Sequence, residues 1–193
     1  MKRCLDLYKG ANKMFGRKKT INNYEYFGKM DHSDIPANER FKEKLDFLAL
    51  SQVRRQAVTN LSELYKEHRN YILDNFYERL LDISDFRTII EENSSLERLK
   101  VTFDRHFTSL FEDELNLEYV FKRRRIAFTH ARIGVLPNWM ISAYTLINQL
   151  IIPLIVKEYG RDQRKMLDAL LAYDSLVTID IQIIVETYIE IQG

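Results

Sequence analysis

Residues 163–192, at the C-terminal end of the chain, constrain the fold most strongly, because apolar side chains cover most faces of one predicted long helix. A helix that is apolar over so much of its circumference needs more than one neighbouring helix. We therefore expect this segment to be a deep core helix, part of a subunit interface, or both. The apolar residues spaced mostly by three and four are Leu167, Leu170, Leu171, Val177, Ile181, Ile184, Val185 and Tyr188, and Ile179, Ile183, Ile189 and Ile191 lie on other faces.

The rest of the chain supports an all-α fold. Only six glycines and three prolines interrupt its 193 residues, 46% of which are hydrophobic, which suits long helices joined by short turns. A regular helical pattern begins at Asn38, whereas residues 1–37 combine glycines with a basic cluster and show no sustained period. We expect an N-terminal extension over 1–37, with one short helix around 5–15, and a single domain over 38–193.

Capping signals place several helix ends. Ser94 and Glu97 form a potential capping box for a helix that ends near residue 112, and Asn116 can cap a helix over 117–132. Pro137 starts a helix to residue 159, with a kink expected at Pro153, and Asp162 can cap the last helix. Upstream, one apolar stripe continues from residue 45 to 64, and a separate amphipathic helix is predicted over 71–83.

Charge and cysteine content exclude several classes of partner and compartment. With 29 basic and 28 acidic residues, the chain has a net charge of +1, so no overall field favours nucleic acid or anionic lipid. The single cysteine, Cys4, indicates a reducing cytoplasm. The apolar run over 141–156 contains polar residues and is shorter than the roughly 20 residues of a spanning helix. We expect no membrane insertion.

His130 is the candidate metal ligand, because it lies on an apolar helical face just before the break at Gly134 and Pro137. An imidazole in this position can bind a metal or simply fill the core, and spacing alone leaves both possibilities open. The segment His130-x-Arg-Ile-Gly-x-Leu-Pro-x-Trp139 resembles the proximal segment of globin-coupled sensors, the heme domains of bacterial and archaeal aerotaxis transducers. The resemblance extends over about residues 45–190 and is strongest over 76–139.

This resemblance implies a globin-like fold that binds heme b, with His130 as the proximal iron ligand. It also implies that Tyr77 and Thr102 stabilise a bound ligand from the distal side, since iron-bound dioxygen carries partial negative charge that a hydroxyl group can stabilise. Without the resemblance, Tyr77 could be a core residue and Thr102 could bond the carbonyl one turn back. The expected heme-pocket residues are Phe76, Leu99, Phe103, Ile126, Ile133, Leu136, Trp139 and Met140. Met140 departs from the aromatic hydroxyl that aerotaxis relatives often have there.

Two further groups are interpreted as structural. The run Lys122–Arg125 is expected to form a solvated helix face, from which one base could pair with a heme propionate. His106 lies one turn beyond Thr102 and is expected to be a core or rim residue, whereas His32 and His68 are expected to be exposed.

The sequence thus predicts a cytoplasmic, non-enzymatic sensor domain for a diatomic gas, with oxygen as the expected ligand. The last two helices would form a homodimer interface and pass the signal to an output domain outside this chain. The main alternative is a heme-free, globin-like interaction module of a stress-signalling complex. A redox enzyme such as a globin-type dioxygenase or peroxidase is a third possibility, but no reductase domain or acid-base pair supports it.

Overall fold

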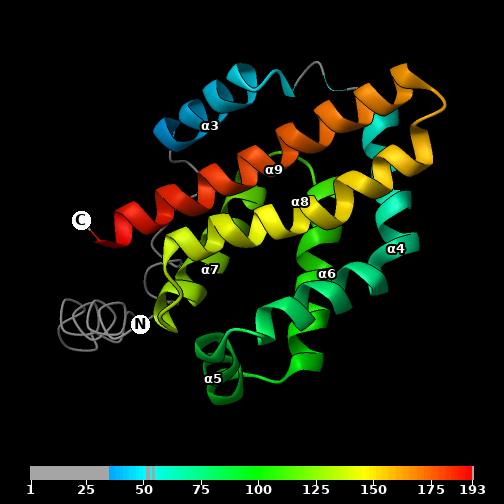
Figure 1. Ribbon diagram of the computed structural model, residues 1–193. Helices are drawn as coiled ribbons and strands as arrows, with labels where there is room; N and C mark the ends of the chain where they lie inside the picture. Colours follow the sequence, from blue (N-terminus) through cyan, green and yellow to red (C-terminus); the bar gives the residue numbers. More distant parts are fainter. Residues whose placement is uncertain (1–34, 51–52, 54, 193) are drawn as a thin grey trace. The chain divides into compact units, whose positions relative to one another are not determined.

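The computed structural model describes residues 35–50, 53 and 55–192, which form helices without any strand (Figure 1). The predicted all-α class is therefore confirmed. The predicted extension and its short helix lie outside the described residues, apart from positions 35–37. The helices are α3 (Ile35–Phe47), α4 (Arg55–Leu81), α5 (Ser84–Asn93), α6 (Leu96–Glu112), α7 (Leu117–Arg132), α8 (Pro137–Tyr159) and α9 (Gln163–Gln192).

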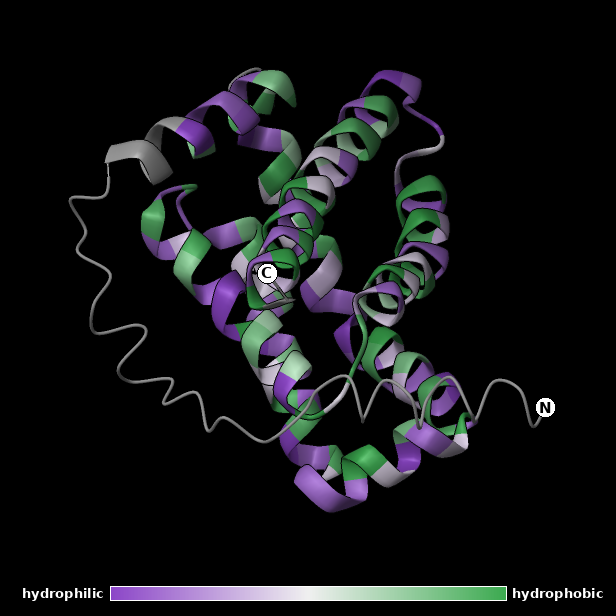
Figure 2. Ribbon diagram, turned by 90° about the vertical axis from the view of Figure 1, so that its left-hand side faces the viewer, coloured by the Kyte–Doolittle hydropathy of each residue, from purple (hydrophilic) through white to green (hydrophobic). Residues whose placement is uncertain are grey.

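The long apolar helix α9 is the centre of the packing. It lies against α4, α6, α7 and α8, and α8 runs beside it in Figure 1. Ala169, Ile179 and Thr187 on α9 are completely buried, which confirms that this segment is a core helix. Figure 2 shows both hydrophobic and hydrophilic residues along the described helices, as expected of helices that have a buried and a solvent-facing side.

The strongest local signals placed α7, α8 and α9 correctly. The Asn116 side chain accepts a hydrogen bond from the backbone N–H of Tyr119 at 3.1 Å, and Asp162 accepts one from that of Lys165 at 3.0 Å. Gly134 ends α7 with a φ of 86°, and the Val135 N–H donates to the His130 carbonyl oxygen at 3.0 Å. This pairing is typical of a helix that stops at a left-handed residue.

The N-terminal half of the domain differs from the prediction in three places. The apolar stripe over 45–64 is not one helix, because α3 ends at Phe47 and α4 begins only at Arg55. Between them, Ala49 has a positive φ of 50°. The helix predicted to begin at residue 71 is instead the second half of α4, and α5 was not predicted. The N-cap of α6 is Ser95, which accepts from the Arg98 N–H, while Ser94 ends α5.

Candidate heme site

His130 lies in the last turn of α7 with its ring already oriented by the backbone. Its Nδ1 is 2.8 Å from the carbonyl oxygen of Ile126, one turn earlier. Because a carbonyl oxygen can only accept, Nδ1 carries the hydrogen and donates it, which leaves Nε2 with a free lone pair. This is the tautomer that a metal-binding imidazole needs, with its second nitrogen held by a backbone acceptor.

The surroundings of His130 also favour the neutral ring. Burial lowers the pKa of His130, the hydrogen bond to Ile126 opposes this shift, and the electrostatic effect of His106 lowers the pKa further. A lowered pKa means that the ring is in its neutral form at neutral pH, with one hydrogen on Nδ1. Its Nε2 lone pair is then available to a metal without a competing proton.

Aromatic residues from α4 and α6 pack together among the predicted distal residues. The ring centroid of Phe76 is 4.9 Å from that of Phe103, and the Tyr77 centroid is 6.2 Å from Phe103. Burial raises the pKa of Tyr77, so its hydroxyl keeps its hydrogen and can donate it. Trp139, at the start of α8, meets Phe86 of α5 with centroids 4.9 Å apart.

Thr102 has a different setting. It is exposed, and its hydroxyl donates to the carbonyl oxygen of Arg98 at 2.9 Å, which is the local bond that a helical threonine commonly makes. The ligand-stabilising role of Thr102 therefore stays a prediction, because the hydroxyl would have to turn away from Arg98 to serve it.

The remaining predicted pocket residues are apolar and at least partly buried. Met140 is buried, in keeping with the packing role expected for a methionine at this position. The half-buried members are Leu99, Ile126, Ile133 and Leu136.

The basic run on α7 was interpreted wrongly in part. Arg123 is completely buried and its Nε donates to Oδ1 of Asp180 on α9 at 2.5 Å, although Lys122 is exposed as expected. Arg124 is also largely covered and pairs with Glu190 of α9. The signal for Arg123 was Asp180 itself, an acid within the apolar residues of the last helix, since such a charge needs a partner when buried.

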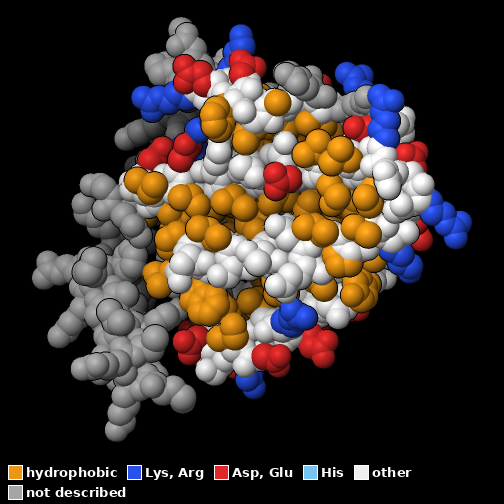
Figure 3. All heavy atoms as spheres, turned by 45° about the horizontal axis from the view of Figure 1, so that its top comes forward, with side chains coloured by type: hydrophobic (Ala, Val, Ile, Leu, Met, Phe, Trp, Pro, Cys, Tyr) orange, Lys and Arg blue, Asp and Glu red, His pale blue; other side chains and the backbone are white. Residues whose placement is uncertain are grey.

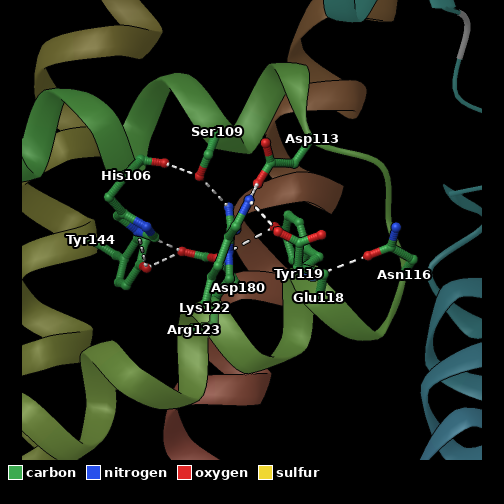
Figure 4. Close-up of polar contacts among 10 residues, drawn as sticks. All are labelled: His106, Ser109, Asp113, Asn116, Glu118, Tyr119, Lys122, Arg123, Tyr144 and Asp180. Carbon is green, nitrogen blue, oxygen red and sulfur yellow. Dashed lines mark hydrogen bonds and ion pairs between the residues drawn. The ribbon is translucent and has the colours of Figure 1, made fainter. Parts of the chain in front are cut away.

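Asp180 collects polar side chains from three other helices (Figure 4). Tyr119 and Arg123 come from α7, Tyr144 from α8 and His106 from α6. His106 Nε2 lies 3.0 Å from Oδ2 of Asp180, and the His106 side chain is largely buried, in agreement with the predicted core or rim position. His68 is half-buried rather than exposed, with Nε2 4.0 Å from Glu67.

A search of this chain against known protein families finds protoglobin, whose family model matches residues 37–192. The chain belongs to the protoglobin family. The protoglobin domain thus begins at the start of the regular helical pattern and continues through α9.

Solved structures show the same fold. The globin domain of a Geobacter sulfurreducens globin-coupled sensor superimposes with a TM-score of 0.67 at 21% identity, over 76% of this chain and 96% of that one. The ferrous form of the globin domain of E. coli DosC gives 0.64 at 16% identity, over 75% and 97%. The ferric form gives 0.62 at 16% identity, over 74% and 97%. The predicted globin-like fold is therefore confirmed.

The globin fold implies a heme, and the residues of this protoglobin fit that group. His130 has the tautomer of an axial ligand, because its Nδ1 donates to Ile126 and its Nε2 is left to bind iron. Side chains of the predicted pocket are largely hydrocarbon, as the faces of a porphyrin require. The fit thus depends on one oriented imidazole and on the apolar residues predicted for the pocket.

Proposed function

We propose that this chain is a heme-based sensor domain that binds a diatomic gas reversibly, with oxygen as its ligand. The observation that carries the proposal is the hydrogen bond from Nδ1 of His130 to the Ile126 carbonyl. It orients the imidazole at the end of α7 and leaves Nε2 as the nitrogen that a metal would use. Membership of the protoglobin family supports the same conclusion.

Each proposed residue has a distinct task in this function. Heme b would supply a ferrous iron that binds the gas. His130 would hold the iron through Nε2, and Tyr77 would donate a hydrogen bond to the negative end of bound oxygen. Phe76, Phe103 and Met140 would exclude water, which keeps charge separation in the pocket unfavourable and slows the oxidation of the iron.

We also propose a homodimer formed by α8 and α9. Both helices combine a buried side with exposed apolar residues, and hydrophobic side chains gather on the face seen in Figure 3. Leu167 and Leu171 are one turn apart on α9 and are 55% and 57% exposed, so they present adjacent apolar side chains that a second chain could cover. The other exposed apolar residues of these helices are Ile141, Ile152, Val156 and Ile189.

This arrangement accounts for the hydropathy of α8. By length and composition alone, residues 137–159 could cross a membrane. Met140, Tyr144 and Ile155 are nevertheless buried against the rest of the domain, and α8 packs on α4 and α9. We propose that α8 is a core and interface helix of a cytoplasmic, non-enzymatic sensor domain.

An absorption spectrum of the heme-reconstituted protein tests the proposed function. Spectra are recorded for the oxidised protein, the reduced protein, and the reduced protein exposed separately to oxygen and to carbon monoxide. A stoichiometric Soret band and a stable oxygen-bound form are expected. Absence of saturable heme binding would support the heme-free interaction module instead. Turnover of peroxide or nitric oxide well above that of free heme would favour a redox enzyme.

A further inference from the structure

The completely buried carboxylate of Asp180 joins four helices at one point. Oδ1 accepts hydrogen bonds from Arg123 Nε at 2.5 Å and from the Tyr119 hydroxyl at 3.3 Å. Oδ2 accepts from the Tyr144 hydroxyl and faces His106 Nε2 at 3.0 Å. Four partners match the lone pairs that a carboxylate offers, so Asp180 has no capacity left for water.

Arg123 extends this cluster toward the end of α6. Its Nη2 donates to the Ser109 hydroxyl at 3.0 Å, and the Ser109 hydroxyl donates to the His106 carbonyl at 2.6 Å. Arg123 Nη1 lies 3.7 Å from Asp113 Oδ2, and the guanidinium carbon lies 3.4 Å from the centre of the Tyr119 ring. The guanidinium group is therefore fixed in both position and orientation.

Stability alone does not explain such a cluster. Burial by itself would raise the pKa of Asp180, but His106, Arg123 and Tyr144 together hold that pKa well below its usual range, so the charge persists. Buried ion pairs can often be replaced by apolar residues of similar volume without loss of stability. What the polar cluster adds is a fixed relative position of the helices that contribute to it.

Each helix that meets α9 at this cluster also contributes to the proposed heme pocket. On α7, Arg123 precedes His130 by seven residues, about two turns, so both project from the same side of the helix. On α6, His106 follows Phe103 by three residues, and on α8, Tyr144 follows Met140 by four.

We infer that Asp180 is the positioning residue through which ligand-dependent movement of the proximal helix α7 reaches α9. This inference rests on the proposed function, and α9 also forms part of the proposed dimer face. A shift of His130 moves Arg123 because both belong to one helix, and Arg123 cannot move without displacing Asp180 or losing its buried partner. The pair therefore couples α7 and α9 more strictly than apolar contacts would.

Hydrogen exchange in the full heme-loaded chain tests this role. Exchange of the α9 amides over residues 176–188 is compared between the reduced, unliganded state and the carbon monoxide complex. The variants are Asp180→Asn and the double variant Arg123→Met/Asp180→Asn, which removes both charges together and so leaves no unpaired charge buried. Glu190→Gln is the matched control, because the Arg124–Glu190 pair also joins α7 to α9 but at a largely exposed carboxylate.

In the wild type and in Glu190→Gln, carbon monoxide is expected to change the exchange rates over 176–188. In the double variant this change should shrink by about threefold or more, with heme content and carbon monoxide binding retained. The iron–histidine stretching band of the reduced state should also shift in that variant alone. If Asp180→Asn does not fold, the double variant decides.

The outcomes separate this inference from the function on which it rests. No stoichiometric heme in the wild type would overturn both. Normal heme and carbon monoxide binding in the wild type would leave the proposed function standing. Three results would then overturn the inference about Asp180. They are no ligand-dependent change of exchange in the wild type, the same change in the double variant as in the wild type, or an equal reduction of the change in Glu190→Gln.

Discussion

Among single residues, His130 is the one whose loss should abolish the cofactor site. His130→Ala removes the imidazole that Ile126 orients, so apolar contacts with the porphyrin remain but the axial bond does not. We expect no stoichiometric heme retention, or weak and heterogeneous coordination, in a Soret titration of the heme-free protein. His68→Ala is the matched control, since His68 is a half-buried histidine beside Glu67, and it should bind heme like the wild type. A normal five-coordinate ferrous heme in His130→Ala would disprove the assignment.

Tyr77 should affect the gas rather than the cofactor. Tyr77→Phe keeps the ring that packs on Phe76 and Phe103 but removes the hydroxyl donor. A hydrogen bond to a partly charged acceptor contributes about 1.5 kcal/mol or more, so oxygen should dissociate roughly tenfold faster. Heme content and carbon monoxide dissociation should change little, because bound carbon monoxide carries less partial negative charge than bound oxygen. Stopped-flow measurement of both ligands checks this. An unchanged oxygen rate would remove Tyr77 from the ligand-stabilising role.

The contrast between His130 and Arg123 shows which residue properties the sequence could predict. The bond from His130 to Ile126 is local, within one turn, and the motif around it includes the glycine that ends α7 and the proline that begins α8. Burial of Arg123 depends on Asp180, 57 residues farther along the chain, and no spacing within the basic run distinguishes Arg123 from its exposed neighbour Lys122. Such a pairing is visible only when α7 and α9 are side by side.

For the helices, predictability follows the strength of the terminal signals. α7 has a capping asparagine and a terminal glycine, α8 has an N-terminal proline, and all of these specify a backbone geometry directly. Between α3 and α4 the helical pattern is interrupted at Ala49, where the sequence has no glycine or proline to signal a helix end. We therefore attribute this interruption to tertiary packing. Ser94 and Ser95 are chemically equivalent caps, and the short helix α5 before them decided which one begins α6.

The end of α7 provides a test of how this helix stops next to the proposed heme pocket. Gly134 has a φ of 86°, and an added Cβ would meet no atom within 4 Å, so the cost of Gly134→Ala should come from backbone strain alone. We expect about 1–2 kcal/mol lower free energy of unfolding. Gly134→Asn should cost less, because asparagine tolerates left-handed backbone. Urea denaturation of both variants measures the difference, and equal destabilisation would argue against the strain explanation.

On the scale of the whole molecule, the surface of α9 divides into a buried side and an exposed side that both carry apolar residues. Its inner side fills the core, as the sequence predicted, while its outer side exposes large apolar residues. The sequence left open a core helix, an interface or both; the core role is confirmed, and the interface role stays a proposal. The amino-acid pattern gave the number of apolar faces, but only the packing shows which of them the same chain covers.

If a second copy covers the outer face, a charge placed there should separate the dimer without disturbing the fold. Leu171→Glu puts a carboxylate at a side chain that is 57% exposed, so the single chain tolerates it but an apolar interface does not. Val101→Glu on α6 is the matched control, with a valine that is 59% exposed outside the proposed interface.

Light scattering after size exclusion should give the mass of one chain for Leu171→Glu and of two chains for Val101→Glu and the wild type. A single-chain mass for the wild type, or a two-chain mass for Leu171→Glu, would contradict a dimer centred on this face. Unchanged heme content in Leu171→Glu would then show that the pocket is complete within one chain, since His130, Tyr77 and their neighbours come from α4, α6, α7 and α8 of the same domain.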